Sequence, residues 1–537
     1  MLEGVGAYRS NSKAALRNIR RAVQLICLAL WVALFLATRQ QALALIPPDL
    51  FLMTDPLVAA VSMGAAHVFV PIMLTSLVLV VVGLVLGRVF CGWVCPLGTL
   101  IDAMGKVFRP PDDRFSLRTH QRMRRWKYYV LAFMVFGALL SSQWVYLLDP
   151  LVVLFRGVAA GIYPLLGGIL PGELGTTFSE VAFLPLGLLV AILLLTAITR
   201  RFYCRYLCPL GAFYGLLARL PLMRRRVKGC DACAKVGVRK QCVSGCRMGA
   251  VPPNPHRTLN HECIRCFSGR AFCHIEAIGF DFGPPGRWAP RVRQEIERRD
   301  KRVGPPLTGE RRSPDVALKL DRRRFLIVGA AGLGLAPLVA VSRNPRGDPN
   351  RIIRPPRVRD ENTFMAQCIR CGMCAQACPT QTLQLLHLEA GLSGLWTPAI
   401  TPRVGGCKAD CNACGEVCPT NAIVEFEKHE ADKWVTKMGT AVLEKSRCIS
   451  YTQNTPCKKC LEACPTWAFE VDPDDGTHPL RPSGVKYDRC VGCGLCEHAC
   501  RKIVFGRPAL LTFSHGRGQP TSLPYEPTEE KKNQGKG

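Results

Sequence analysis

Four closely spaced cysteine runs in the C-terminal half restrict the fold of this chain more than any other feature. Bacterial ferredoxins carry C-x₂-C-x₂-C-x₃-C-P runs, in which three thiolates reach three corners of a [4Fe–4S] cube and the fourth ligates the partner cluster. The sequence therefore predicts four [4Fe–4S] clusters in this half. The predicted ligands are Cys368, Cys371, Cys374, Cys378, Cys407, Cys411, Cys414, Cys418, Cys448, Cys457, Cys460, Cys464, Cys490, Cys493, Cys496 and Cys500.

Zinc sites and disulfides explain these runs less well. A zinc site needs only two cysteine pairs and rarely repeats a run of this spacing. Disulfides between thiols this crowded would be strained. The spacing leaves open whether the runs pair in sequence order or nested.

A second cysteine-rich module, at 226–280, is less regular. If the last cysteine of each run ligates the cluster of the other run, which we call the crossed rule, one cluster has four ligands. The other is one ligand short, because Gly269 stands where a cysteine is expected. The second cluster is then [3Fe–4S], has a non-cysteine fourth ligand, or is absent. His274 is a weak candidate ligand because it directly follows Cys273. The first set is Cys230, Cys233, Cys242 and Cys273, and the second is Cys246, Cys263 and Cys266.

Long apolar stretches precede this module and predict a membrane domain. Hydrophobic residues make up 48% of a chain that is 20% charged. The net charge of +30 follows from Lys and Arg beside apolar stretches, which the positive-inside rule explains, and no nucleic-acid motif is present. The N-terminus and the module at 226–280 are therefore predicted in the cytoplasm. The predicted spans are Ala22–Thr38, His67–Gly87, Tyr128–Leu148 and Val181–Thr199.

Two further apolar segments have different interpretations. Leu151–Leu170 is interrupted by glycine and proline, which favours a re-entrant or interfacial segment on the outer side. Asp321–Ser342 begins with Arg322 and Arg323 before a Gly/Ala-rich apolar run, as twin-arginine export signals do, although an ordinary fifth span has similar flanks. Both alternatives carry the C-terminal half outward. Twin-arginine transport moves folded cargo, as a domain that receives its clusters in the cytoplasm requires.

A C-x₃-C-P motif follows two of the predicted spans. Cysteines four apart share one face of a helix, and the proline should open the turn towards cytoplasmic water. The four thiols are predicted to hold a metal centre or to relay electrons, the alternative being that they pack as small apolar side chains. Cys27, alone in the first span, is interpreted as packing. The motif cysteines are Cys91, Cys95, Cys204 and Cys208.

With these motifs, the chain resembles a fusion of two ferredoxin-type partners. Residues 1–280 resemble the membrane polyferredoxins NapH, of periplasmic nitrate reductase systems, and MauN, of methylamine utilisation. Residues from Asp321 onward resemble the exported four-cluster ferredoxins NapG and MauM. The departures are Gly269, the fusion itself, and Arg247, His274 and Arg501 where proline often follows the last cysteine.

The resemblance implies electron transfer from quinol, or from a cytoplasmic donor, to a periplasmic redox enzyme or cytochrome. The chain would be a quinol dehydrogenase component without a catalytic acid–base pair of its own. The alternatives are an electron-supplying assembly or maturation factor for a metalloenzyme, and a redox sensor or membrane anchor. Polar groups at the outer membrane edge are predicted to face the quinone: His67, Asp55, Gln143 and Asp149.

The predicted fold class is an α-helical membrane domain of about four spans joined to α+β ferredoxin-like iron–sulfur domains. The predicted location is a bacterial inner membrane, with the C-terminal domain in the periplasm. The predicted segments are a membrane domain with two C-x₃-C-P motifs (1–215), a cytoplasmic ferredoxin-like module (226–280), a flexible linker (281–320), a fifth span or signal anchor (321–342), a periplasmic ferredoxin domain (351–510) and a disordered tail (511–537).

Overall fold

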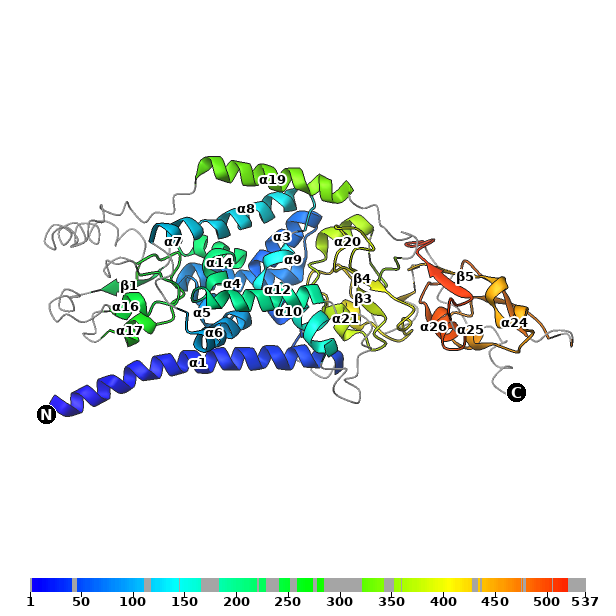
Figure 1. Cartoon of the computed structure of the whole chain (residues 1–537), viewed down its shortest axis with the longest axis horizontal. Coiled ribbons are helices and arrows are strands. Elements are labelled where there is room, and N and C mark those ends of the chain that lie inside the picture. The colour runs from blue at the N-terminus through cyan, green and yellow to red at the C-terminus, as the bar shows by residue number, and fades with distance from the viewer. Residues whose placement is uncertain are drawn as a thin grey trace.

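The computed structural model is mostly helical, with a cysteine-rich module at each end of a helical domain (Figure 1). We call the module that contains Cys242–Cys273 the inner module, and the one that contains Cys368–Cys500 the outer module. The structure describes residues 2–40, 46–110, 117–143, 145–165, 183–219, 222–227, 241–251, 258–273, 278–283, 321–341, 352–358, 360–426, 433–434, 437–474, 476, 480–504 and 506–519.

Four helices of the helical domain begin in the same way, with a capping side chain followed by proline and leucine. Proline suits the first helical position because its missing N–H would have no partner there. Asp55 caps α3 and Asp149 caps α10 through carboxylate oxygens, while the Cys95 and Cys208 thiols cap α6 and α14. The helices of this domain are α1 (Leu2–Gln40), α2 (Leu50–Met53), α3 (Pro56–Ala66), α4 (Ser76–Leu86), α5 (Val89–Trp93), α6 (Pro96–Phe108), α7 (Leu117–Met123), α8 (Trp126–Leu139), α9 (Val145–Leu148), α10 (Pro150–Gly157), α12 (Phe183–Leu194), α13 (Phe202–Tyr206) and α14 (Pro209–Leu217).

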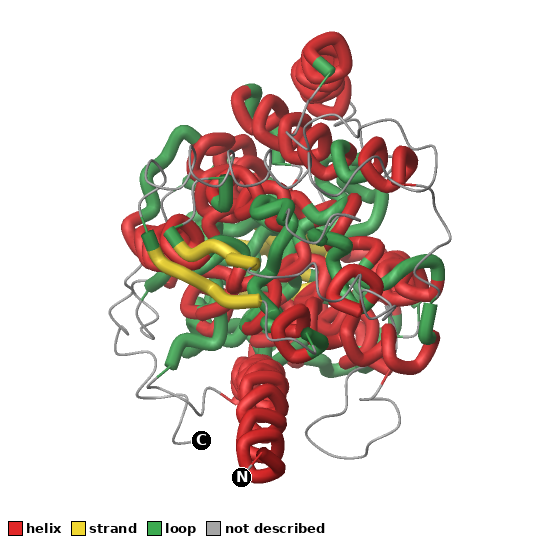
Figure 2. Tube along the Cα trace, turned by 90° about the vertical axis from the view of Figure 1, so that its left-hand side faces the viewer, coloured by secondary structure: helices red, strands yellow, loops and turns green. Residues whose placement is uncertain are grey.

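The inner module contains a short antiparallel ribbon, β1 (Met223–Val227) with β2 (Ile278–Phe282), in which Met223 faces Phe282. Its helices are α16 (Gln241–Ser244) and α17 (Ser268–Ala271). Figure 2 looks onto this end of the molecule, where the two strands lie in front of the helices. A longer helix, α19 (Arg322–Val341), packs along α8 through Gly329 and Gly332, which meet Phe133 and Phe136.

The outer module consists of short helices and three two-stranded antiparallel ribbons, β3–β4, β5–β8 and β6–β7. Its elements are α20 (Glu361–Gln367), α21 (Met373–Ala377), β3 (Leu383–Leu385), β4 (Pro398–Ile400), α22 (Ala413–Glu416), β5 (Thr440–Leu443), α24 (Ile449–Thr452), α25 (Lys459–Glu462), β6 (Phe469–Asp472), β7 (Arg481–Val485), α26 (Leu495–Arg501) and β8 (Leu510–Phe513).

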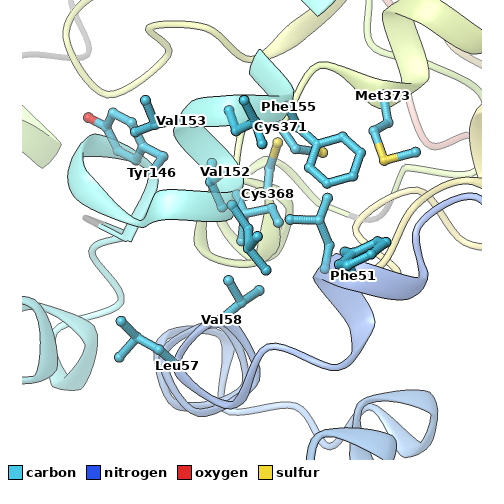
Figure 3. Close-up of a cluster of buried hydrophobic side chains, with 14 of the residues drawn as sticks. Phe51, Leu57, Val58, Tyr146, Val152, Val153, Phe155, Cys368, Cys371 and Met373 are labelled. Atoms are coloured by element: carbon cyan, nitrogen blue, oxygen red, sulfur yellow. The ribbon is translucent and has the colours of Figure 1, made fainter. Parts of the chain in front are cut away.

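The outer module packs directly on the helical domain, and one hydrophobic core runs through both. Figure 3 shows Cys368 and Cys371 of the outer module beside Val152 and Phe155 of α10. The guanidinium of Arg156 lies 3.9 Å from the Trp396 ring centroid, and that of Arg370 lies 3.8 Å from the Tyr146 ring. Apolar packing and cation–π contacts thus fix this junction.

Among the described residues, one helical segment, Leu16–Thr38, is long and apolar enough to cross a membrane. It coincides with the first predicted span. The other three predicted spans fall on shorter apolar helices, because helix α4 starts only after a 3₁₀ turn at Pro71–Thr75 and α8 ends at Leu139. The prediction of four full-length spans is therefore not supported by helix length.

The described part of the segment predicted as re-entrant or interfacial forms α10 and a π-helical turn, Val158–Ile162, and α10 is buried under the outer module. Its position at a membrane stays a prediction. One boundary prediction differs from the structure. The tail predicted to be disordered from residue 511 starts too early, because Leu511 and Thr512 pair with β5 and are buried. Apart from its first three residues, the predicted linker at 281–320 lies outside the described residues.

Candidate iron–sulfur sites

The third and fourth outer runs line two separate pockets, and each pocket takes one cysteine from the partner run. The first pocket contains Cys490, Cys493 and Cys496 with Cys464. The second contains Cys448, Cys457 and Cys460 with Cys500. We call them site 3 and site 4. The remaining lining is mostly apolar, as a buried cluster requires.

The first and second runs follow the same crossed rule. The Cys374 thiol interacts electrostatically with Cys368, Cys371 and Cys418, which form site 1. The Cys414 thiol interacts with Cys407, Cys411 and Cys378, which form site 2. Adjacent runs therefore pair in sequence order, the alternative that spacing had left open.

The four outer sites lie in a row. Cys374 of site 1 also interacts with Cys414 of site 2, and the Cys407 N–H of site 2 donates to the Cys493 carbonyl of site 3 at 2.8 Å. Cys496 of site 3 interacts with Cys460 of site 4. Site 1 is at the helical domain, and α24 and α25 carry site 4 at the far end (Figure 1). The row therefore leads away from the helical domain.

The thiols fit iron–sulfur clusters better than single ions. Within the described part of the chain, no three Cys, His, Asp or Glu side chains are close enough to hold one metal ion. In a [4Fe–4S] cluster each thiolate binds a different iron, so wider spacing is required. Backbone N–H groups also donate to sulfur, from Ala441 to Cys490 at 3.3 Å, from Ala468 to Cys464 at 3.4 Å and from Ile423 to Cys418 at 3.4 Å. Such bonds stabilise the negative charge of a cluster's thiolates.

In the inner module, Cys246 interacts with Cys263 and Cys266, while Cys242 and Cys273 pack together around Ile278. That these cysteines ligate clusters stays a prediction. Cys230, Cys233 and His274 lie outside the described residues. Among the described residues, a Cβ atom at Gly269 would meet only Ile278 Cδ1, at 3.9 Å, which is ordinary van der Waals contact.

The structure brings the four C-x₃-C-P thiols together and buries three of them, while Cys91 is partly exposed. Cys95 interacts electrostatically with Cys91 and Cys204, and Cys208 with Cys91 and Cys204. Cys95 and Cys208 are 8% and 5% exposed. The predicted opening towards water is therefore wrong for Cys95 and Cys208, because each proline starts a new helix whose first turn is buried. Their metal-binding role stays a prediction.

Among the polar residues predicted at the outer edge, Asp55 and Asp149 come together. Both are buried, their carboxylates interact electrostatically, and each has one oxygen without a hydrogen-bond partner among the described residues. Gln143 instead donates to the Ala366 carbonyl of the outer module at 3.2 Å, and His67 is exposed at the end of α3. A sequence signal for the pair was missed, since Asp-Pro-Leu-Val occurs at both Asp55 and Asp149.

Two buried ion-pair groups hold the inner module against the helical domain. Glu262 lies between Lys127 Nζ, at 2.6 Å, and Arg88 Nη1, at 2.9 Å, and all three side chains are 0% exposed. Burial raises the pKa of Glu262, but the charges of Lys127 and Arg88 outweigh it and lower the pKa to about 2. The glutamate is therefore ionised at neutral pH.

The second group surrounds Asp102 of α6. Arg20, Arg201 and Arg247 contact its carboxylate at 2.6 to 2.7 Å, and they come from α1, the second C-x₃-C-P segment and the inner module. Burial raises the pKa of Asp102, but these cations lower it below its usual range. This one carboxylate thus links three parts of the chain.

We expect Gly92→Ala to displace the inner module from the first C-x₃-C-P segment. A Cβ atom at Gly92 would lie 2.5 Å from the Ile264 carbonyl oxygen, which backbone cannot accommodate without moving. Faster proteolysis of the inner module in the folded protein would show the displacement. Gly64→Ala is the control, because a Cβ there meets nothing within 4 Å. Equal proteolysis of both variants would contradict the expectation.

Comparisons with known proteins match the C-x₃-C-P segments, the first outer run, and most of the third and fourth outer runs. A 4Fe-4S binding domain model matches residues 68–111 and again 181–228, the two C-x₃-C-P segments. A 4Fe-4S dicluster domain matches 455–504, and a further 4Fe-4S binding domain matches 364–384. No solved structure matches.

Curated relatives cover part of the chain. The ferredoxin-type protein NapG of Escherichia coli is 36% identical over 218 residues, which are 37% of this chain and 88% of NapG. The methylamine utilisation ferredoxin-type protein MauM of Paracoccus denitrificans is 34% identical over 218 residues, 40% of this chain and 92% of MauM. NapG of Haemophilus influenzae is 33% identical over 217 residues, 36% of this chain and 73% of that protein.

Proposed function

Because this chain belongs to the family of ferredoxin-type proteins that includes NapG and MauM, we propose that it passes electrons from quinol, or from a cytoplasmic donor, to a periplasmic redox partner. It is an iron–sulfur electron-transfer protein, as its 4Fe-4S domains indicate. The proposal adds three points to iron–sulfur electron transfer: a NapH-like membrane half, quinol as the donor and a periplasmic partner as the acceptor.

The row of sites 1 to 4 carries the proposal. A storage or sensing protein has no need for four clusters in line, whereas a conductor needs each cluster close to the next. Site 1 lies against the helical domain, where α21 contacts α1 and the π-helical turn Val158–Ile162, and site 4 lies at the opposite end of the outer module. Electrons would enter the row at site 1 and leave at site 4 towards the partner.

The helical domain would lie in the bacterial inner membrane, with the inner module in the cytoplasm and the outer module in the periplasm. Large apolar side chains are exposed on the helices that coincide with the predicted spans, for example Leu25 at 63%, Val78 at 65% and Leu194 at 51%. Such exposed apolar surface requires a lipid or protein partner. The inner and outer modules pack at opposite ends of these helices, as the proposal requires.

Reduction of the purified protein by quinol tests the proposal. The full chain is oxidised anaerobically, mixed with menaquinol or ubiquinol, and followed by absorbance and EPR. We expect either quinol to reduce clusters of the outer module. Clusters that dithionite reduces but neither quinol does would contradict a quinol donor, and would favour the cytoplasmic donor and the maturation role.

We expect Arg322→Lys with Arg323→Lys to leave the outer module in the cytoplasm. A twin-arginine signal needs both guanidinium groups, and both side chains are exposed at the start of α19. A reporter fused after the outer module measures its side of the membrane. Arg324→Lys is the matched control, because it retains the arginine pair. Export in cells that lack the twin-arginine translocase would contradict the assignment.

A further inference from the structure

The two C-x₃-C-P segments are copies of one unit, and neither copy can hold a cluster alone. Both read Arg-x₂-Cys-x₃-Cys-Pro-Leu-Gly, starting at Arg88 and at Arg201, and the same 4Fe-4S binding domain model matches both. Each copy supplies only two thiols. A cluster held by four thiolates therefore requires both copies at once.

The structure places the copies face to face. Thiols of the two copies interact with each other across the contact, Cys95 with Cys204 and Cys208 with Cys91. The next helix of each copy, α6 or α14, begins directly after its second cysteine. The thiols thus gather where two helix N-termini, which favour negative charge, come close together.

The arginines of the two copies cross over reciprocally. Arg201 of the second copy donates from Nη1 to the Cys91 carbonyl at 2.9 Å and from Nη2 to the Gly98 carbonyl at 3.2 Å. Arg88 of the first copy reaches the equivalent glycine, since a Cβ at Gly211 would lie 2.7 Å from Arg88 Nη2. The two copies are therefore related by approximate two-fold symmetry, with each arginine reaching into the other copy.

Arg88 pairs with Glu262 through Nη1, but two of its buried nitrogens lack an acceptor among the described protein atoms. Its side chain is 0% exposed, and its Nε and Nη2 have no hydrogen-bond partner among the described residues. Its charge interacts with the thiols of Cys91 and Cys208. Buried guanidinium nitrogens of this kind cost free energy unless an acceptor is present.

The second thiol of each copy has the hydrogen bond found at the ferredoxin-type sites. Gly98 N donates to Cys95 Sγ at 3.4 Å, and Gly211 N donates to Cys208 Sγ at 3.2 Å. At Cys246 of the inner module, Ala250 N donates to Sγ at 3.2 Å. The second motif thiols, which also cap helices, therefore accept a backbone N–H as thiols at the ferredoxin-type sites do.

We propose that Cys91, Cys95, Cys204 and Cys208 together hold one iron–sulfur cluster, shared between the two copies and lying beside the guanidinium groups of Arg88 and Arg201. These arginines belong to ion-pair groups in which cations outnumber carboxylates, two to one around Glu262 and three to one around Asp102, so the surroundings favour a negatively charged cluster. Cluster binding would leave Cys95 and Cys208 as caps of α6 and α14, and would leave Arg88 and Arg201 paired with their carboxylates.

The position of this centre gives it a role as an electron relay, and that role rests on the proposed function. The Trp93 Nε1–H donates to the Arg265 carbonyl at 3.0 Å, so the first copy touches the loop that contains Cys263 and Cys266. On the other side, α6 packs against α10, which lies beside site 1. The cluster would take one electron as the inner cluster is oxidised, and lose it as site 1 is reduced.

Iron analysis of the full chain with Cys95→Ser and Cys208→Ser tests the proposal. We expect iron and acid-labile sulfide to fall by the content of one cluster, two atoms each for a [2Fe–2S] centre or four for a [4Fe–4S] centre. One EPR signal of the dithionite-reduced protein should disappear. Cys27→Ser is the matched control, a lone cysteine of α1, and should lose none. Unchanged iron and spectra in the double variant would overturn the proposal.

A second variant decides the matter if the double variant does not fold. Cys91 is only partly buried, so Cys91→Ser should leave the fold intact and remove one ligand. We expect the signal of one cluster to change, and an unaltered spectrum would overturn the proposal. Loss of iron in these variants, together with a wild-type protein that no quinol reduces, would establish the cluster and reject only the quinol donor.

Discussion

Replacing Cys414 by serine is expected to abolish electron arrival at site 4 while site 1 still becomes reduced. Cys414 lies in site 2, and site 2 is the only link between sites 1 and 3 in the described part of the outer module. Electron transfer falls steeply with distance, so a row that has lost one member should stop conducting. EPR of the quinol- or dithionite-treated full chain, frozen at successive times, would follow each site.

Cys457→Ser is the matched control for this experiment. Cys457 lines site 4 at the end of the row, so its loss should leave reduction of sites 1, 2 and 3 at the wild-type rate. Reduction of site 4 at the wild-type rate in Cys414→Ser would mean that electrons enter the outer module elsewhere, and the row would not be the conducting path.

Glu262→Gln should destabilise the attachment of the inner module by about 3–5 kcal/mol, the cost of leaving buried charges without their partner. The change leaves Lys127 and Arg88 facing each other in a region where all three side chains are 0% exposed. Thermal release of the inner cluster's absorbance in the full chain measures the effect.

Glu444→Gln is the control for Glu262. Glu444 is 38% exposed and pairs with Arg447 one helical turn away at 3.2 Å, so its loss should change stability by less than about 1 kcal/mol. If Glu262→Gln released the inner cluster at the same temperature as Glu444→Gln, the buried pair would not be what holds the module.

The cluster chemistry of the outer module could be predicted from the sequence because ligand spacing within a run is local. The spacing of Cys490, Cys493 and Cys496 alone indicates three corners of a cube, and the structure places Cys464 as the fourth. The order of the sites could not be predicted, since it depends on how β5 and β8 bring distant segments together. That arrangement is a property of tertiary packing.

The C-x₃-C-P segments show the opposite limit. Pro96 correctly marks a break after Cys95, but a break in a helix does not reveal what covers it. Here Arg201 and Gly98 of opposite copies make contact, and the thiols become buried. The repeated Asp-Pro-Leu-Val at Asp55 and Asp149 is a sequence signal that the two aspartates are equivalent. The structure brings these two aspartates together.

The exchange of one cysteine between neighbouring runs also governs how the outer module matures. Neither site 1 nor site 2 has a complete ligand set until both runs have folded together, because Cys418 belongs to one and Cys378 to the other. The same holds for sites 3 and 4 through Cys464 and Cys500. Each pair of sites therefore depends on a single folding event, so a fault in one run should deprive two sites of their complete ligand sets.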